Sequence, residues 1–125
     1  MSIGAFYQTG DFKGEKHVPV IHAPEVVKKG EKIEVKVLIG EEIPHPNTLE
    51  HHISWIKLYF RPEGAKFPIE IGTYDFNAHG ESELFTEPCV ISVFSTTQPG
   101  TLYATSYCNI HGLWENAIDI KVEWY

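Results

Sequence analysis

A cysteine and a histidine three positions apart, Cys108 and His111, are the residues of this chain whose types and spacing best suit metal binding. Thiolate and imidazole are both good ligands for transition metals. Gly112 follows them directly and marks a tight turn. Alone, the pair supplies at most half of a metal site, and a structural role for both residues is then the simpler interpretation.

Three further histidines in two polar segments could complete such a site. His17 precedes the first Val-Pro pair of the chain, and His45 lies between two prolines. Asn47 and Glu50 have the spacing of a capping box, so we expect one short helical turn that brings His51 back toward His45. If the three segments meet, the chain offers four imidazoles and one thiolate.

A ligand set of this kind differs from a structural zinc site, which is usually a closed tetrahedron of four ligands. Five such ligands suit a square pyramid with an open sixth position. Imidazole accepts iron, copper, nickel or zinc, so the ligand types leave the metal open. We interpret His22, His52 and His79 as surface or structural histidines, and Cys89 as a buried free cysteine.

The elements that must position these residues are short alternating runs broken by Gly and Pro, with no sustained helical period. The clearest expected strands are 31–39, 53–60 and 117–124, and the weaker ones are 68–76, 89–94 and 101–107. Six or seven strands at this spacing favour an all-β antiparallel sandwich. The alternation of Leu102, Ala104 and Ser106 continues to Cys108, which predicts that the thiol lies on the apolar side of its strand. A thiolate there needs a neutralising cation.

Length and charge restrict the function further. The chain has 125 residues, which fits a single domain over 1–125, and a formal charge of −7. Binding to nucleic acid is not expected, because phosphates need a basic surface. We expect no membrane span and no signal peptide, which favours a cytoplasmic protein. Two cysteines do not make a disulfide framework.

With these segments the sequence resembles the one-iron superoxide reductases (neelaredoxins), which are related to the iron domain of desulfoferrodoxin. The resemblance runs from about Gly10 to the C-terminus, and its order and spacing match throughout. It rests on the motifs 14–19, 44–47 with 50–52, and 106–114. The larger members carry a second iron on four N-terminal cysteines, which this chain lacks.

The resemblance implies an immunoglobulin-like antiparallel sandwich of about seven strands with one iron ion per chain. His17, His45, His51 and His111 would be equatorial ligands and Cys108 the axial one. Glu15 would bind the ferric ion and leave the ferrous one, and Lys16 would lie beside the open position. We expect Lys16 to attract the anionic substrate and to order a proton-donating water.

The implied activity is that of an oxidoreductase, which reduces superoxide by one electron to hydrogen peroxide and protects against oxidative stress. It would need an external electron donor, such as rubredoxin or a similar small redox protein. The family also implies a homodimer or homotetramer. The alternative is a non-enzymatic metal-binding or electron-transfer sandwich, for example with copper, although blue-copper sites use only two histidines.

Overall fold

The computed structural model describes residues 1–123 and contains strands and two short 3-10 turns. The prediction of an all-β sandwich is confirmed. The elements are, in chain order, η1 (Ile3–Phe6), β1 (Val20–His22), β2 (Val26–Lys28), β3 (Lys32–Leu38), β4 (Ile53–Pro62), β5 (Ile69–Asp75), η2 (Glu81–Glu83), β6 (Cys89–Ser95), β7 (Gly100–Cys108) and β8 (Gly112–Glu123). Among these residues no helix has the length and apolar character that crossing a membrane requires.

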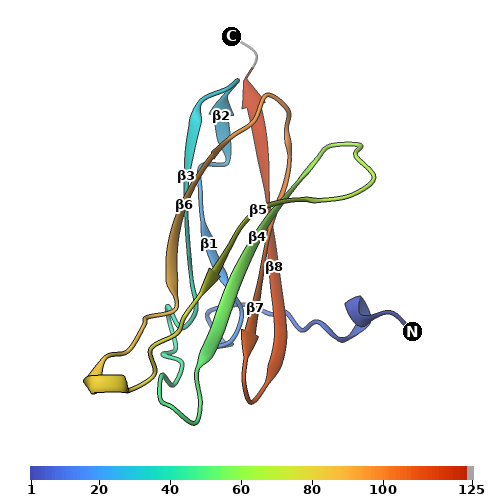
Figure 1. The fold of residues 1–125 in the computed structure, drawn as a ribbon. Coiled ribbons are helices and arrows are strands. Elements are labelled where there is room, and N and C mark those ends of the chain that lie inside the picture. Colours follow the sequence, from blue (N-terminus) through green and yellow to red (C-terminus); the bar gives the residue numbers. More distant parts are fainter. Residues whose placement is uncertain (124–125) are drawn as a thin grey trace.

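Two sheets pack face to face. The smaller has the order β1-β3-β6, and the larger has the order β2-β8-β7-β4-β5 (Figure 1). All neighbouring strands are antiparallel except β2 and β8, which run parallel. The expected sandwich was wholly antiparallel, and the difference arises from β2 alone, because β1 pairs antiparallel with β3. Neither β1 nor β2 was predicted, since each is only three residues long, too short to show a period in the sequence.

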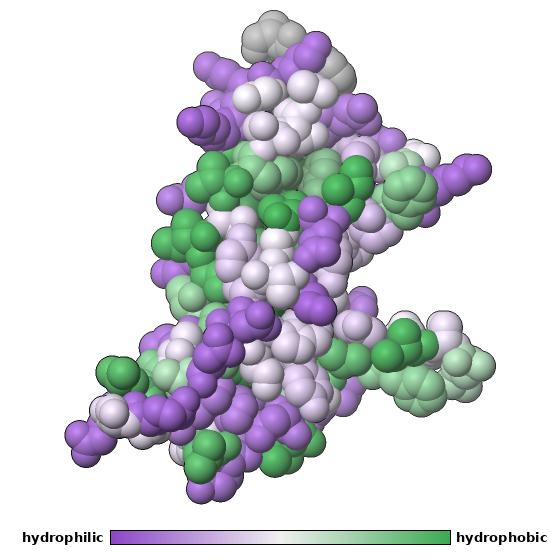
Figure 2. Space-filling model, in the orientation of Figure 1, coloured by the Kyte–Doolittle hydropathy of each residue, from purple (hydrophilic) through white to green (hydrophobic). Residues whose placement is uncertain are grey.

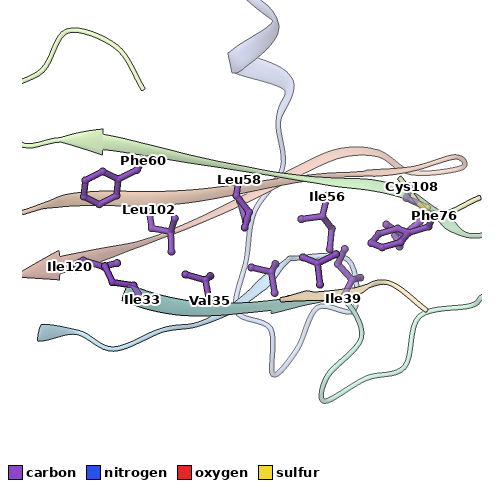
Figure 3. Close-up of a cluster of buried hydrophobic side chains, with 14 of the residues drawn as sticks. Ile33, Val35, Ile39, Ile56, Leu58, Phe60, Phe76, Leu102, Cys108 and Ile120 are labelled. Atoms are coloured by element: carbon purple, nitrogen blue, oxygen red, sulfur yellow. The ribbon is translucent and has the colours of Figure 1, made fainter. Parts of the chain in front are cut away.

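The core lies between the sheets and follows the alternation of each strand. Ile33, Val35 and Val37 point inward from β3 and are at most 1% exposed, as their spacing predicts. Leu102 and Ala104 of β7 meet them from the opposite sheet and are also fully buried. Figure 3 shows these side chains in one layer that extends from Phe60 and Ile120 at one end to Phe76 and Cys108 at the other. Cys108 is therefore the last residue of the apolar layer.

The alternation of β6 corrects one expectation. Cys89 is exposed, not buried, although it precedes an apolar run. Val90 and Ser92 take the inward positions of this strand, so Cys89 and Ile91 must point outward. Of the predicted strand 117–124, only Trp124 lies outside the described residues. The real strand begins five residues earlier, at Gly112.

Three irregular segments lie at the end of the sandwich that holds Cys108. They are the segment before β1, the long connection between β3 and β4, and the tip of the β7–β8 hairpin (Figure 1). Ile53 of β4 pairs with Cys108, and the register shifts before Trp55, so that a β-bulge lies beside the thiol. Bulges of this kind change the direction of neighbouring side chains. The fold thus brings together the three segments in which the sequence has its candidate ligands.

Candidate metal centre

Four of the predicted ligands converge at this end of the sandwich. One ligand atom from each of His17, His45, His51 and Cys108 lies within 4.8 Å of all the others. The four come from three segments that are far apart in the chain. The sequence could not show whether these segments meet, and in the structure they do. A group of three nitrogens and one sulfur this compact is suited to a single metal ion.

Cys108 is held by the most regular part of the fold. It is the last residue of β7, pairs with Ile53 on one side and Gly112 on the other, and is 0% exposed. Its Sγ atom lies 3.5 Å from His45 Nε2 and 3.8 Å from His111 Nδ1. The buried thiol therefore faces imidazole nitrogens, and a metal ion bound by these nitrogens would lie within reach of the sulfur and neutralise a thiolate there.

The His17 ring is held by one contact on its face and another at its edge. The indole of Trp114 stacks on it, with ring centroids 4.8 Å apart and an angle of 14° between the planes. At the ring edge, His17 Nδ1–H donates to the Glu15 carboxylate over 2.6 Å, and the His17 amide donates to the same oxygen. A carboxylate on one ring nitrogen leaves the other nitrogen, Nε2, as the ligand atom.

The Glu15 carboxylate is thereby directed to the edge of His17. Partial burial alone would raise the pKa of Glu15, but the hydrogen bonds from the His17 ring and amide lower it below its ordinary value. Glu15 is consequently ionised at neutral pH and supports the imidazole from outside the group of four ligand atoms.

His45 is positioned by a glycine turn. Gly40 has φ +88°, and a Cβ atom at this position would lie 2.7 Å from the backbone nitrogen of His45. His45 Nδ1–H donates to the carbonyl of Pro46 over 2.6 Å, which turns Nε2 toward the thiol. Burial and then the neighbouring charges of His17, His51 and Lys16 lower the pKa of His45 to about 4, although the bond to Pro46 opposes this. The ring is therefore neutral and able to bind a metal at physiological pH.

His51 reaches the group without the expected helical turn, so that prediction was wrong. The His51 backbone amide donates to the Thr48 hydroxyl oxygen, and the Thr48 backbone amide donates to the His51 carbonyl, opposite to the helical direction. The Asn47 side chain does not cap this segment but donates to the carbonyl of Thr86. His51 Nε2 is buried and has no hydrogen-bond partner among residues 1–123. Such an orphaned nitrogen is the strongest sign of a missing ligand at the site.

His111 lies next to this group but does not belong to the four residues whose ligand atoms are all within 4.8 Å of one another. Its Nδ1 atom is 3.1 Å from His17 Nε2 and 3.8 Å from Cys108 Sγ, and its ring is exposed. Its backbone carbonyl accepts a bond from the Trp114 indole. The imidazole is therefore at the solvent side of the site and contacts three of the four converging residues, because its ring centroid also lies 5.1 Å from that of His51.

Lys16 places a positive charge at the rim. Lys16 directly precedes His17 in the chain, and its charge is among the smaller causes that lower the pKa values of both His45 and His51. Burial is the first cause of the lowered pKa of His51, followed by the charges of His111 and His17. A half-buried lysine beside neutral imidazoles provides a local positive field in a protein of net charge −7.

The remaining histidines lie outside the converging group, as their interpretation as structural or surface residues expects. His22 pairs with the Glu41 carboxylate over 2.5 Å. His52 and His79 stack on each other with ring centroids 3.5 Å apart. No role for Trp114, Gly40 or Asn109 was predicted from the sequence. Only Gly40 had a usable signal, since a glycine shortly before a candidate ligand often marks a close backbone approach.

Comparison with known proteins agrees with this arrangement. The sequence profile described as desulfoferrodoxin matches residues 9–117. The chain belongs to the desulfoferrodoxin family. Superoxide reductase of Pyrococcus horikoshii is 54% identical, with 91% of this chain and 95% of the relative covered. Superoxide reductase of Pyrococcus furiosus is 53% identical, with the same two coverages.

Members of the family with solved structures have the same fold. A protein of Thermotoga maritima superposes with a TM-score of 0.95 at 55% identity, covering 98% of both chains. The reduced superoxide reductase (neelaredoxin) of Archaeoglobus fulgidus gives a TM-score of 0.85 at 48% identity, covering 92% of this chain and 98% of the other. The likeness therefore includes the strands and loops that position the candidate metal centre.

Proposed function

We propose that the chain is a superoxide reductase that reduces superoxide by one electron to hydrogen peroxide at a single non-haem iron. One observation carries the proposal: three imidazoles and a buried thiol, from three distant segments, have ligand atoms within 4.8 Å of one another. Membership of a family whose close relatives are named superoxide reductases supports the same activity.

The residues present fit an iron ion. Cys108 would supply a thiolate, and His17, His45, His51 and His111 would supply imidazole nitrogens. A bound metal cation would satisfy the orphaned His51 Nε2 and neutralise the buried Cys108 sulfur, which would offset the cost of burying both groups. When bound, iron supplies the electron, and a thiolate ligand raises the electron density available for it.

The protein residues would bind and protonate the substrate. Lys16 is the charge we assign to attraction of the superoxide anion, since the net charge of −7 repels it at long range. Salt screens that repulsion beyond about 8 Å, so a local positive field still directs the anion to the site. Lys16 would also order the water that delivers protons. Glu15 would hold the His17 ring as it does here, and would enter the ligand set in the ferric state.

Each turnover needs an electron from outside, and we infer a small redox protein such as rubredoxin as the donor. The exposure of His111 and of Ile110, which is 58% exposed at the hairpin tip, supports direct access from solvent to this end of the molecule. A partner that docks there would reach the candidate metal centre without any rearrangement of the sandwich.

We also propose that the chain, as one domain over 1–125, assembles into a homodimer or homotetramer. The N-terminal arm, Met1–Phe6, supports this assembly. None of its residues in η1 is buried, and Ile3 and Phe6 are 67% and 66% exposed. Figure 2 shows it as an apolar projection from the body. Exposed apolar surface of this kind is typical of contacts between chains.

A reducing compartment suits the two cysteines, and we propose the cytoplasm. Both are free, and Cys89 is exposed to solvent. An exposed thiol persists in a reducing environment but is oxidised or paired outside it. This supports the same location that the sequence predicts.

Product analysis tests the proposed activity. Anaerobic, iron-loaded protein reduced beforehand should yield hydrogen peroxide from superoxide without release of dioxygen. Stoichiometric dioxygen would indicate dismutation and contradict the proposal. The alternative function, electron transfer by a copper protein, predicts purification with copper and an intense blue band. One iron per chain after expression in iron-supplemented medium would rule that alternative out.

A further inference from the structure

The segment that carries His51 is joined to the segment that carries Cys108 through one side chain, that of Asn109. Asn109 Nδ2–H donates to the backbone carbonyl of Glu50 over 2.9 Å. Its Oδ1 atom accepts a bond from the backbone amide of His52, also over 2.9 Å. The backbone amide of Asn109 donates a third bond, to the His52 carbonyl, over 3.2 Å. The two side-chain bonds thus hold the peptide groups on either side of His51.

The rest of the His51 turn is bonded within itself. Thr48 exchanges bonds with His51 through its amide and hydroxyl, and its carbonyl accepts from the His52 ring. These contacts set the shape of the turn but not its place on the molecule. Within residues 1–123, each hydrogen bond that joins turn 48–52 to the hairpin tip 109–111 involves Asn109.

We propose that Asn109 is a positioning residue that places the His51 imidazole against Cys108 before any metal binds. The inference rests on the proposed metal site, whose ligands it orients, but concerns a residue outside the ligand set. Asparagine suits the task because its amide offers a donor and an acceptor at once. Aspartate retains only the acceptor, and alanine has neither group.

By holding turn 48–52 in place, Asn109 would reduce the conformational entropy that is lost when a metal binds. Turn 48–52 is at the surface, and its residues Thr48, Leu49 and Glu50 are exposed. If the turn were free, metal binding would have to order it, and that cost would reduce the affinity. With Asn109 in place, the order is already present in the metal-free protein. Loss of such an outer contact typically weakens metal binding by about 10–100-fold.

The first test uses Co(II) alone as the probe, titrated into metal-free protein and followed by its thiolate absorption band. For Asn109→Ala we expect a dissociation constant about 10–100-fold higher than that of the parent protein. Glu50→Gln is the matched control, because the Asn109 bond uses the Glu50 carbonyl and not its side chain. It should bind cobalt as the parent does. Equal affinities of Asn109→Ala and the parent would overturn the proposal.

The second test needs no metal and measures hydrogen exchange at the His52 amide. This amide should be protected in the metal-free parent and in Asn109→Asp, which keeps the acceptor, but should exchange freely in Asn109→Ala. A change of global stability alone would not separate the two variants in this way. Protection in Asn109→Ala would contradict the inference. If the parent binds no cobalt through its thiolate, the metal site fails, while the exchange data still decide the role of Asn109.

Discussion

The indole of Trp114 lies almost parallel to the imidazole of His17, at 14° and with ring centroids 4.8 Å apart, and donates its Nε1–H to the carbonyl of His111 over 3.3 Å. One side chain therefore supports two of the residues that surround the candidate metal centre. Trp114 is 6% exposed, so it is also part of the packing at this end of the sandwich.

Replacement of Trp114 should separate these two contributions. Trp114→Ala removes a buried aromatic ring and should lower the free energy of unfolding by about 3–5 kcal/mol. Trp114→Phe keeps an aromatic face toward His17 and loses the indole hydrogen bond, which costs about 1 kcal/mol before repacking. Urea unfolding of the metal-free variants measures both values. Equal losses in the two variants would show that the ring itself contributes little.

Gly40 should be indispensable for the position of His45. Alanine there must adopt φ +88° and place its Cβ 2.7 Å from the His45 nitrogen. We expect Gly40→Ala to destabilise the protein by more than the ~1–3 kcal/mol of backbone strain and to weaken Co(II) binding. Gly64→Ala is the matched control, since Gly64 has φ +80° and nothing within 4 Å of the added atom. Similar behaviour of the two variants would contradict the proposed crowding.

The stability of the metal-free protein should fall as the pH falls from about 6.5 toward 4. His45 binds a proton in the unfolded chain near its ordinary pKa of 6.5, but in the folded chain only at about 4. Protons therefore favour the unfolded state in this window, and His51, whose pKa is also lowered, acts in the same direction. Because the His45 ring is half-buried and water screens it, we expect about 1–2 kcal/mol. Urea unfolding of His45→Gln should show a flatter pH profile, and an unchanged profile would refute this origin.

Neutralising Lys16 should slow the reaction with superoxide. We expect Lys16→Ala to reduce the second-order rate constant by about 3–10-fold at low salt and to weaken its dependence on ionic strength. Lys16→Arg retains the charge and should keep the salt dependence. Pulse radiolysis of the reduced protein at several salt concentrations provides the measurement. An unchanged rate and slope in Lys16→Ala would remove this residue from substrate attraction.

Glu15 has a contact that its expected role as a ferric ligand did not include. Its carboxylate holds His17 Nδ1 in this structure. Glu15→Ala should therefore weaken metal binding in both oxidation states, because the His17 ring loses its orientation, and should also change the ferric absorption spectrum. Glu15→Gln, which retains an acceptor for the ring N–H, should restore most of the affinity. Identical ferric spectra of the parent and Glu15→Ala would argue against ligation.

The strands were predictable because burial imposes a two-residue period. That period identified the inward face of β3 and the burial of Cys108 at the end of β7. It failed for β1 and β2, which have three residues each, and it was not applied to Cys89, whose outward position follows from the burial of Val90. Strand length therefore limits what the pattern can reveal.

The candidate ligands were recognisable from residue type, but their supports were not. Nothing in the composition of 47–51 shows that the Thr48 hydroxyl displaces a helical turn, because that outcome depends on which groups bind the Asn47 side chain and the His51 amide. Trp114 and Asn109 act through contacts with residues distant in the chain, His17 and Glu50. Such contacts appear only once the hairpin tip and the loops are placed together.

Because a strand carries the candidate thiolate ligand and irregular segments carry three of the imidazole ligands, the two kinds of ligand could be altered separately. The sulfur of Cys108 is fixed by the central strand of the larger sheet, whereas His17, His45 and His51 come from irregular segments outside the strands. The strands of the sandwich therefore fix the position of the thiolate ligand, and the loops fix the positions of the three imidazole ligands. Grafting different loops onto the same eight strands would alter the coordination sphere while leaving the thiolate anchor where it is.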